Sequence, residues 1–178
     1  MEVLTKELHN KIKAVRCLIL DVDGVLTDGG IVFDDEGRQI KRFDVRDGHG
    51  LKMLMRYGIE VALLTGRTSQ VVLHRALDLG IEDVYQGAKN KLDVYNEILR
   101  KKNILPSVTA FVGDDVVDVP VLRRVGFSAT VADAADAVKK VVDYITERNG
   151  GRGAVREICE IILQAKGHWA EVAARYEL

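Results

Sequence analysis

Three features that would mark a special class of protein are missing from this sequence. Lysine and arginine (26) do not outnumber aspartate and glutamate (27), so the basic excess of a nucleic-acid-binding protein is absent. No N-terminal apolar run is long enough for a signal peptide or a membrane span, and we expect a soluble, cytoplasmic protein without membrane insertion. The only cysteines, Cys17 and Cys159, stand in apolar runs, which indicates buried reduced thiols rather than a disulfide or a catalytic pair.

The sequence also lacks linkers, internal repeats and low-complexity tracts. With 178 residues and 47% apolar residues, the chain is long enough to bury a sizeable core. We therefore expect one domain over residues 1–178. Residues 167–178 form a C-terminal tail, whose simplest interpretation is a frayed terminal helix.

Short apolar runs alternate with longer amphipathic stretches, a pattern that predicts an α/β fold with a doubly wound parallel sheet. The predicted strands are 17–21, 61–65, 83–86, 109–113 and 127–131. The predicted helices are 5–12, 50–56, 69–79, 91–101 and 118–123. A β-hairpin is expected from 31–33 and 39–45, which flank a turn-forming stretch at 34–37. Strand 127–131 completes the regular part of the predicted fold.

Two carboxylates follow the first predicted strand. Asp21 and Asp23 are separated by one residue and precede Gly24. Ligands of parallel sheets collect at the carboxyl ends of strands, and two acids there need a cation or a shared proton. Mg²⁺ suits the place, because it binds one or two carboxylates together with a phosphate. The alternative is that both acids only form a turn.

The next two predicted strands also end in polar groups. Thr65, Gly66 and Arg67 follow strand 61–65 with a hydroxyl, a glycine and a guanidinium, which suit a phosphoryl group. Lys91 starts the helix after strand 83–86, where a lysine is more often simply solvated.

A second acidic cluster follows strand 109–113. It contains Asp114, Asp115 and Asp118, and the spacing predicts that Asp114 and Asp118 share one helical face. Helix N-capping would account for Asp115. It does not explain why four strands of one sheet end in such residues.

In this order the residues resemble the haloacid dehalogenase-like phosphohydrolase superfamily. Its four motifs are matched by Asp21-Val-Asp23-Gly, Thr65, Lys91 and Gly113-Asp-Asp-Val-Val-Asp118. The segments 21–29, 43–50, 64–67, 85–92 and 150–157 narrow the resemblance to a capless subfamily. This resemblance implies hydrolysis of 3-deoxy-D-manno-octulosonate 8-phosphate in lipopolysaccharide synthesis.

The resemblance implies a division of roles among the acids. Asp21 would be the nucleophile that forms an aspartyl-phosphate, and Asp23 the general acid and base. The side chains of Asp21 and Asp114 and the backbone carbonyl of Asp23 would hold Mg²⁺, although an oxygen site of this kind also accepts Mn²⁺ or Co²⁺. Asp115 and Asp118 would orient this shell.

The resemblance also implies how the sugar phosphate is held. Thr65 and Lys91 would donate to the phosphoryl oxygens. The substrate has a carboxylate at its other end, for which Arg67, next to Gly66, and Arg75 are the candidate partners. Relatives that act on a nine-carbon 9-phosphate have an acid after Thr-Gly, so Arg67 favours the eight-carbon substrate. A plain surface arginine is the alternative for Arg75.

No cap domain fits into this chain. Only the hairpin and one helix separate Asp23 from Thr65, and one helix and one strand separate Thr65 from Lys91. The site would therefore be open unless a neighbouring subunit covers it. The resemblance implies a homotetramer whose hairpin and C-terminal segment reach an adjacent site, with Trp169 and Arg175 as contacts to test.

Other functions stay open at this point. A phosphoacceptor receiver module of signalling also carries acids, a threonine and a lysine at strand ends, but it lacks an acid/base residue two positions after the acceptor. An inactive binding protein on this scaffold is disfavoured because no motif residue is missing. Phosphatase activity on a nine-carbon 3-deoxy-ulosonate 9-phosphate or on other sugar phosphates is a further alternative.

Overall fold

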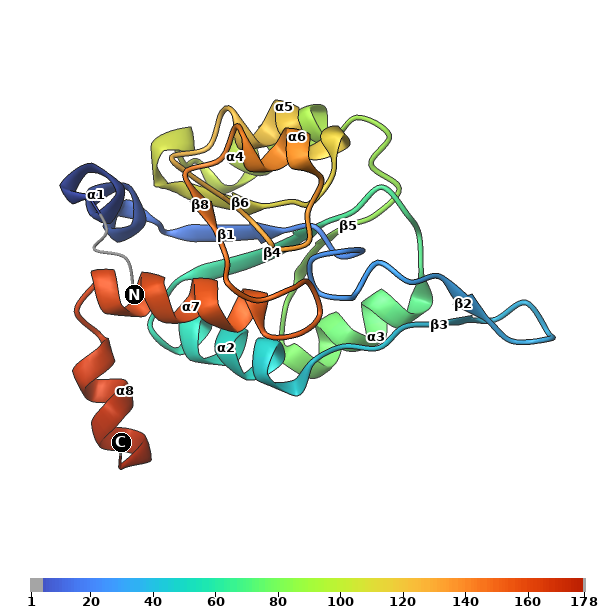
Figure 1. Ribbon diagram of the computed structural model, residues 1–178, viewed down its shortest axis with the longest axis horizontal. Helices are drawn as coiled ribbons and strands as arrows, with labels where there is room; N and C mark the ends of the chain where they lie inside the picture. Colours follow the sequence, from blue (N-terminus) through green and yellow to red (C-terminus); the bar gives the residue numbers. More distant parts are fainter. Residues whose placement is uncertain (1–4, 178) are drawn as a thin grey trace.

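A parallel sheet of six strands forms the centre of the computed structural model, which describes residues 5–177 (Figure 1). The spatial order of the strands is β5-β4-β1-β6-β7-β8, and all neighbours in it are parallel. The bounds are β1 (Cys17–Leu20), β4 (Glu60–Leu64), β5 (Asp83–Tyr85), β6 (Thr109–Val112), β7 (Phe127–Thr130) and β8 (Tyr144–Ile145). This arrangement confirms the predicted doubly wound fold, and β8 extends it by one strand.

Helices cover both faces of the sheet (Figure 1). One layer contains α2 (Val45–Arg56), α3 (Gln70–Leu79) and α7 (Ala154–Ala165), with α1 (Lys6–Ala14) and α8 (Trp169–Tyr176) at its end. The other contains α4 (Lys91–Lys102), α5 (Val119–Leu122) and α6 (Asp136–Lys139). Two short 3-10 helices, η1 (Pro106–Val108) and η2 (Val116–Asp118), precede β6 and α5. In β1, Leu18 and Leu20 join the first core, whereas Cys17 and Ile19 join the second. Burial on both faces explains why β1 is apolar throughout.

The insertion after β1 is a hairpin and one helix, so the predicted absence of a cap domain is confirmed. Strands β2 (Val32–Phe33) and β3 (Gln39–Ile40) pair antiparallel and project away from the sheet (Figure 1). The carboxylate of Asp34 accepts from the N–H groups of Glu36 and Arg38 and so shapes the turn.

Helix α2 begins earlier than predicted, and β3 is shorter than the predicted strand 39–45. Asp44 caps the helix by accepting from the Arg46 N–H at 2.7 Å. Two glycines lie inside the helix where propensity disfavours them. A Cβ on Gly48 would lie 2.2 Å from Nη2 of Arg75, and a Cβ on Gly50 would lie 3.2 Å from Cα of Arg156. Close packing of α3 and α7 against α2 therefore outweighs helix propensity.

Regular structure continues beyond the predicted elements. Helix α6 and strand β8 follow β7, and the twelve-residue α7 packs along α2. The tail over residues 167–177 contains α8, which is docked on the same chain. Val172 is buried, the rings of Tyr57 and His168 stack with centroids 4.6 Å apart, and Arg56 donates to the Tyr176 hydroxyl at 3.3 Å. Within this part of the tail, the frayed-helix interpretation does not hold.

The predictions for the two cysteines are confirmed. Cys17 and Cys159 are buried and free, and burial raises the pKa of the Cys17 thiol to about 12. Across residues 5–177, none of the helices has the length and apolar character needed to cross a membrane.

Candidate active site

The loop after β1 starts as a continuation of the sheet and then turns sharply. The Asp21 N–H donates to the Val112 carbonyl at 2.9 Å, and the Val22 carbonyl accepts from the Leu26 and Thr27 N–H groups at 2.9 and 3.1 Å. Gly24 has a φ of +89°, a conformation that favours glycine. The chain thereby presents Asp21 at the carboxyl edge of the sheet.

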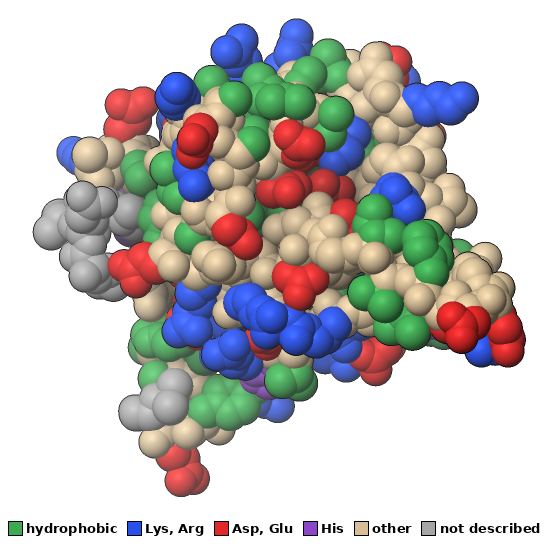
Figure 2. Space-filling view, turned by 45° about the vertical axis from the view of Figure 1, so that its right-hand side comes forward, with side chains coloured by type: hydrophobic (Ala, Val, Ile, Leu, Met, Phe, Trp, Pro, Cys, Tyr) green, Lys and Arg blue, Asp and Glu red, His purple; other side chains and the backbone are tan. Residues whose placement is uncertain are grey.

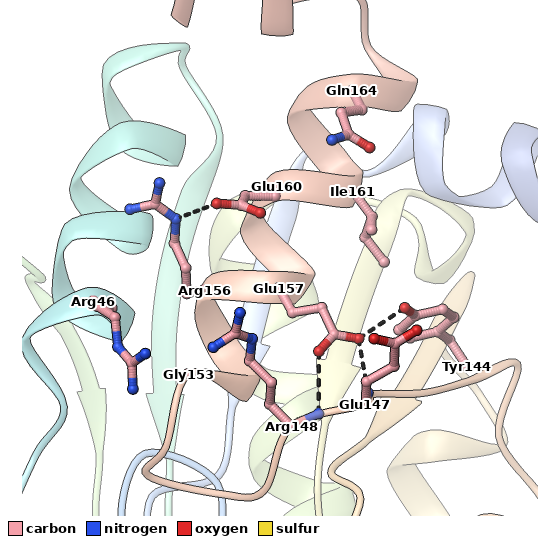
Figure 3. Close-up of a pocket in the computed structure, with 10 residues that line it drawn as sticks. All are labelled: Arg46, Tyr144, Glu147, Arg148, Gly153, Arg156, Glu157, Glu160, Ile161 and Gln164. Atoms are coloured by element: carbon pink, nitrogen blue, oxygen red, sulfur yellow. Dashed lines mark hydrogen bonds and ion pairs between the residues drawn. The ribbon is translucent and has the colours of Figure 1, made fainter. Parts of the chain in front are cut away.

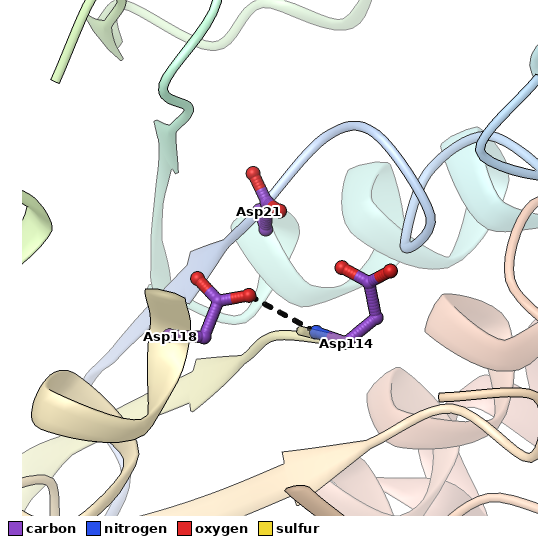
Figure 4. Close-up of side chains that lie close together, drawn as sticks. All are labelled: Asp21, Asp114 and Asp118. Carbon is purple, nitrogen blue, oxygen red and sulfur yellow. Dashed lines mark hydrogen bonds between the residues drawn. The ribbon is translucent and has the colours of Figure 1, made fainter. Parts of the chain in front are cut away.

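Three carboxylates meet at this edge. One oxygen each from Asp21, Asp114 and Asp118 lie within 4.8 Å of one another (Figure 4). Asp21 directly follows β1, Asp114 lies two positions after the end of β6, and Asp118 ends η2. A Cβ on Gly24 would lie 2.0 Å from Oδ2 of Asp114, so the loop approaches this carboxylate more closely than any other residue type would allow.

Lys91 lies among these acids with only 6% of its surface exposed. Its Nζ is 2.6 Å from Oδ1 of Asp118 and 3.0 Å from Oδ2 of Asp21. The other oxygen of Asp118 accepts from the N–H groups of Asp114 and Asp115 at 3.1 and 3.3 Å. With both oxygens engaged, Asp118 can hold the Lys91 ammonium in place together with the loop that contains Asp114 and Asp115.

The expectation that Asp114 and Asp118 share a helical face was wrong. Asp114 precedes η2, and Asp118 reaches back to it through the hydrogen bond drawn in Figure 4. Asp115 is the N-cap of η2, and its Oδ1 accepts from the Val116 N–H at 2.7 Å. A capping box, rather than a helical period, brings the acids together.

The electrostatics of the cluster favour a bound cation. Burial and then the charge of Asp118 raise the pKa of Asp21, Lys91 lowers it, and the net result is a pKa of about 6. Burial, followed by the charges of Asp21 and Asp118, raises the pKa of Asp114 to about 7. Burial lowers the pKa of Lys91, but the two neighbouring carboxylates outweigh burial and the net direction is upward. Buried carboxylate oxygens of this kind fit the ligand preference of Mg²⁺.

The residues after β4 reach the same edge, because β4 is the neighbour of β1. The Thr65 side chain is buried, and its Oγ1 accepts from the Arg67 N–H at 3.3 Å. Gly66 and Arg67 are exposed. Within residues 5–177 the Arg67 guanidinium has no hydrogen-bond or ion-pair partner.

Arg75 lies at the junction between α3 and α2. Its guanidinium pairs with Asp78 at 2.8 Å, donates to the Asp44 carbonyl at 3.3 Å and lies 5.6 Å from the centre of the Phe43 ring. In the described part of the chain these contacts involve none of the other predicted site residues. The structure therefore does not bring Arg75 together with the acidic cluster.

Sequence analysis missed Lys41, which pairs with Asp23. The Lys41 side chain is 1% exposed and that of Asp23 is 20% exposed. Lys41 follows β3 and has no motif around it that indicates chemistry, so the sequence contains no signal for this contact.

Sequence analysis also missed the role of the glycines at 150 and 151, which hold the Asp21 loop. A Cβ on Gly150 would lie 1.7 Å from the Gly24 carbonyl oxygen, and a Cβ on Gly151 would lie 2.5 Å from the Thr27 carbonyl carbon. The Gly151 N–H donates to the Val25 carbonyl at 2.9 Å. The signal was present, because this glycine-rich run is part of the resemblance.

Asp47 lies in a segment that the resemblance includes. Its carboxylate accepts from the N–H groups of Gly153 and Arg156 at 3.2 and 2.8 Å, and so caps the start of α7. Burial raises the pKa of this carboxyl. Segments 43–50 and 150–157 thus belong to one structural unit behind the Asp21 loop.

Acidic and basic side chains form separate groups on the face shown in Figure 2. Acidic side chains gather near the centre of the face in Figure 2, with a group of lysine and arginine side chains directly below them.

A separate pocket of about 490 Å³ lies beside α7 and is lined by charged groups that include Arg46, Arg148 and Glu157 (Figure 3). Glu157 accepts there from the Tyr144 hydroxyl at 2.8 Å. This pocket contains none of the predicted site residues.

Comparisons with known proteins agree with this geometry. A model of the haloacid dehalogenase-like hydrolase family matches residues 44–126. The chain is 47% identical over 157 residues to "3-deoxy-D-manno-octulosonate 8-phosphate phosphatase KdsC" of Escherichia coli K12, covering 88% of this chain and 84% of that protein.

Solved structures are similar over nearly the whole chain. One is the Moraxella catarrhalis 3-deoxy-D-manno-octulosonate 8-phosphate phosphatase in complex with magnesium, phosphate and KDO, with a TM-score of 0.95, 40% identity, and coverage of 97% of this chain and 99% of that one. The Yersinia pestis enzyme has a TM-score of 0.91 and 41% identity, and the match covers 93% of this chain and 89% of that one. By fold, motif geometry and sequence identity, this chain belongs to the haloacid dehalogenase-like hydrolase family.

Proposed function

We propose that this protein is a Mg²⁺-dependent phosphatase that hydrolyses 3-deoxy-D-manno-octulosonate 8-phosphate to 3-deoxy-D-manno-octulosonate and phosphate, in lipopolysaccharide biosynthesis. The observation that carries the proposal is the meeting of Asp21, Asp114 and Asp118 around Lys91 at the edge of the sheet. The names of the E. coli and M. catarrhalis relatives support the substrate, and the magnesium and phosphate of the M. catarrhalis complex support the chemistry.

The donor set suits Mg²⁺. The side chains of Asp21 and Asp114 and the backbone carbonyl of Asp23 would hold the ion. When bound, Mg²⁺ neutralises charge on the phosphoryl group and on the carboxylates that surround it. Asp118 is not needed as a ligand, because Lys91 and two backbone N–H groups already engage its oxygens.

The reaction proceeds in two displacements. Asp21 attacks phosphorus, the P–O bond of the ester breaks, and the leaving oxygen takes a proton from Asp23. Asp23 then removes a proton from water as the water attacks the aspartyl-phosphate, which releases phosphate and restores the Asp21 carboxylate. Lys91 and Thr65 donate to the phosphoryl oxygens, where negative charge accumulates.

Arg67 is the first candidate for binding the substrate carboxylate. Its guanidinium is exposed, lies two residues after Thr65 and has no partner within residues 5–177. Arg75 is the second candidate, and it would have to exchange its contacts with Asp78 and Asp44 for the substrate. A bidentate arginine fork matches a carboxylate in either case.

We also propose a homotetramer in the cytoplasm, in which neighbouring subunits cover the open site. The projecting hairpin exposes Ile31, Val32, Phe33 and Ile40, each more than half exposed. A cluster of this kind is typical of an association surface. The free thiols of Cys17 and Cys159 suit a reducing compartment.

The test is phosphate release with Mg²⁺ from 3-deoxy-D-manno-octulosonate 8-phosphate, its nine-carbon 9-phosphate analogue and common hexose phosphates. We expect strong preference for the eight-carbon substrate, loss of activity in Asp21→Asn, and retention in Asp28→Asn, an exposed acid of the same loop. Broad weak turnover would contradict the substrate. Stable phosphorylation without turnover would favour a receiver-like module.

A further inference from the structure

Lys41 is a buried cation that contacts the acid/base residue. It follows β3 directly, and its ammonium donates to Oδ1 of Asp23. The side chain is 1% exposed, and within residues 5–177 Asp23 is its only hydrogen-bond or ion-pair partner. Burial removes this ammonium from water, and the hydrogen bond to Asp23 replaces one of the hydrogen bonds that it would make there.

The neighbouring arginine shows what an ordinary link between the hairpin and the loop looks like. Arg42 pairs with Asp28 at 2.7 Å, and both side chains are exposed. Such a surface pair already links the two segments, and it contributes little to the stability of the fold. A largely desolvated pair, such as Lys41 with the one-fifth-exposed Asp23, is weak evidence for a gain in stability, because desolvation offsets much of the attraction. The Lys41 contact therefore calls for a role other than holding the hairpin.

The chemistry of the two atoms defines that role. An ammonium has only donors, so the Asp23 oxygen that accepts from Lys41 cannot also present a proton to it. Oδ1 is engaged in this way, whereas Oδ2 of Asp23 has no hydrogen-bond partner within residues 5–177. The proton that Asp23 gives to the leaving oxygen must then be carried by Oδ2.

We propose that Lys41 is a positioning residue for protonation of the leaving group. By holding Oδ1 it fixes the rotation of the Asp23 carboxyl and aims Oδ2 at the ester oxygen, to which the proton passes as the P–O bond breaks. This inference rests on the proposed phosphatase function. Orientation of a general acid matters because a small misplacement lowers the rate strongly.

The test exploits the fact that only poor leaving groups need the proton. Single-turnover phosphoryl transfer is measured on the Mg²⁺-loaded protein with the sugar phosphate, whose leaving group is an alkoxide, and with 4-nitrophenyl phosphate, whose leaving group is stable without a proton. Lys41→Met is expected to slow the first reaction about 100-fold and the second by less than about 5-fold. Lys41→Arg retains a cationic donor, and we expect it to react with the sugar phosphate at least about tenfold faster than Lys41→Met does.

Arg42→Met is the matched control, since it removes a neighbouring cation from the same segment. We expect it to leave the ratio of the two rates unchanged. The inference is overturned if Lys41→Met slows both reactions equally or does not slow the reaction with the sugar phosphate. If Lys41→Met does not fold, the ratio of the two rates is measured in Lys41→Gln instead, with the same criteria. A wild-type protein that releases no phosphate from the sugar ester would instead refute the proposed function.

Discussion

At the scale of single residues, the site concentrates negative charge that the chain itself does not fully neutralise. Asp21, Asp114 and Asp118 lie together, and Lys91 is the only cation that contacts the cluster within residues 5–177. Burial raises the pKa of Asp21 to about 6 and that of Asp114 to about 7. The metal-free site is therefore destabilised whenever both carboxyls are ionised.

The first prediction concerns stability as a function of pH and Mg²⁺. The two carboxyls titrate near 3.8 in the unfolded chain and at about 6 and 7 in the folded one, so the folded state binds protons more tightly. Their contribution to the free energy of unfolding is thus full below about pH 4 and is lost as the pH rises through 6 to 7. Saturating Mg²⁺ should raise the Tm by about 5 to 10 °C at pH 8 and by less than about half of that at pH 5.

Thermal melts at both pH values, with and without Mg²⁺, check this prediction. Asp114→Asn is the control, because it removes a proposed ligand and should abolish the Mg²⁺ effect. An equal Mg²⁺ shift at pH 5 and pH 8 would show that these carboxyls do not control binding.

The second prediction separates Asp118 from its neighbour Asp115. Asp118 accepts from Lys91 with one oxygen and from two backbone N–H groups with the other, whereas an asparagine can accept with only one. Asp118→Asn should therefore lower kcat/KM about 100-fold and destabilise the fold by about 2 kcal/mol.

Asp115→Asn is the matched control, since asparagine caps a helix as well as aspartate. It should leave kcat/KM and the urea midpoint almost unchanged. Steady-state kinetics and urea unfolding measure both effects. Equal losses in the two variants would mean that Lys91 does not depend on Asp118.

Predictability from the sequence differed among the site residues for a physical reason. Asp21, Asp114 and Thr65 could be assigned to one edge of the sheet because parallel strands bring their carboxyl ends together there, and that rule needs no further knowledge of the fold. Lys41 was missed because its contact with Asp23, 18 residues away, depends on the path of the hairpin. No local period or motif encodes that path.

At the scale of elements, the sheet was more predictable than the segments that pack on it. The strands in the middle of the sheet are short apolar runs that end in polar residues, and such runs can be identified directly. Strand β8 has two residues and helix α6 has four, too few to show a period. Helix α7 is different, because its buried residues Ile158, Cys159 and Ile162 follow a helical spacing that sequence analysis left unused.

The third prediction tests the packing of the glycine-rich loop on the Asp21 loop. Gly151 and Gly58 both have positive φ, at 60° and 75°, so alanine strains the backbone at either place. Only Gly151 also meets another backbone, since its Cβ would lie 2.5 Å from the Thr27 carbonyl carbon.

Gly58→Ala should destabilise by about 1 kcal/mol and leave kcat unchanged. Gly151→Ala should destabilise by about 3 kcal/mol and lower kcat at least about tenfold, because the loop that carries Asp21 must shift. Urea unfolding and initial rates measure the pair. If the two variants behave alike, the glycine-rich loop does not position the site.

At the scale of the whole molecule, the chain has no cap domain within residues 5–177 and has a hairpin whose apolar side chains face solvent. Val32 and Ile40 are cross-strand partners on this hairpin, and Phe33 beside them is 56% exposed. Within the described part of the structure, no contact inside the single chain covers these apolar side chains. The proposed tetramer would bury them, and it was the family resemblance, not a local sequence pattern, that indicated this hairpin as a contact surface.

The fourth prediction follows from that assembly. Ile40→Glu should convert a tetramer into smaller species and lower kcat/KM about tenfold or more, since a charge in an apolar contact is strongly unfavourable. Leu105→Glu is the control, because Leu105 is 70% exposed and lies apart from the hairpin, before η1. Light scattering after gel filtration gives the masses. A wild-type monomer, or an unchanged mass in Ile40→Glu, would contradict the proposed interface.

The most direct test of the central claim is to trap a phosphoryl group on Asp21. Asp23→Asn retains the nucleophile but lacks the base that activates water. The leaving group of 4-nitrophenyl phosphate, 4-nitrophenolate, departs without protonation by an acid. With Mg²⁺ and this ester, acid quenching and peptide mass analysis should find one phosphoryl group on the peptide that contains Asp21, and none in Asp21→Asn. Absence of the phosphoryl group in Asp23→Asn, while the wild-type protein turns over the same ester, would show that water attacks phosphorus directly and that Asp21 is not the nucleophile.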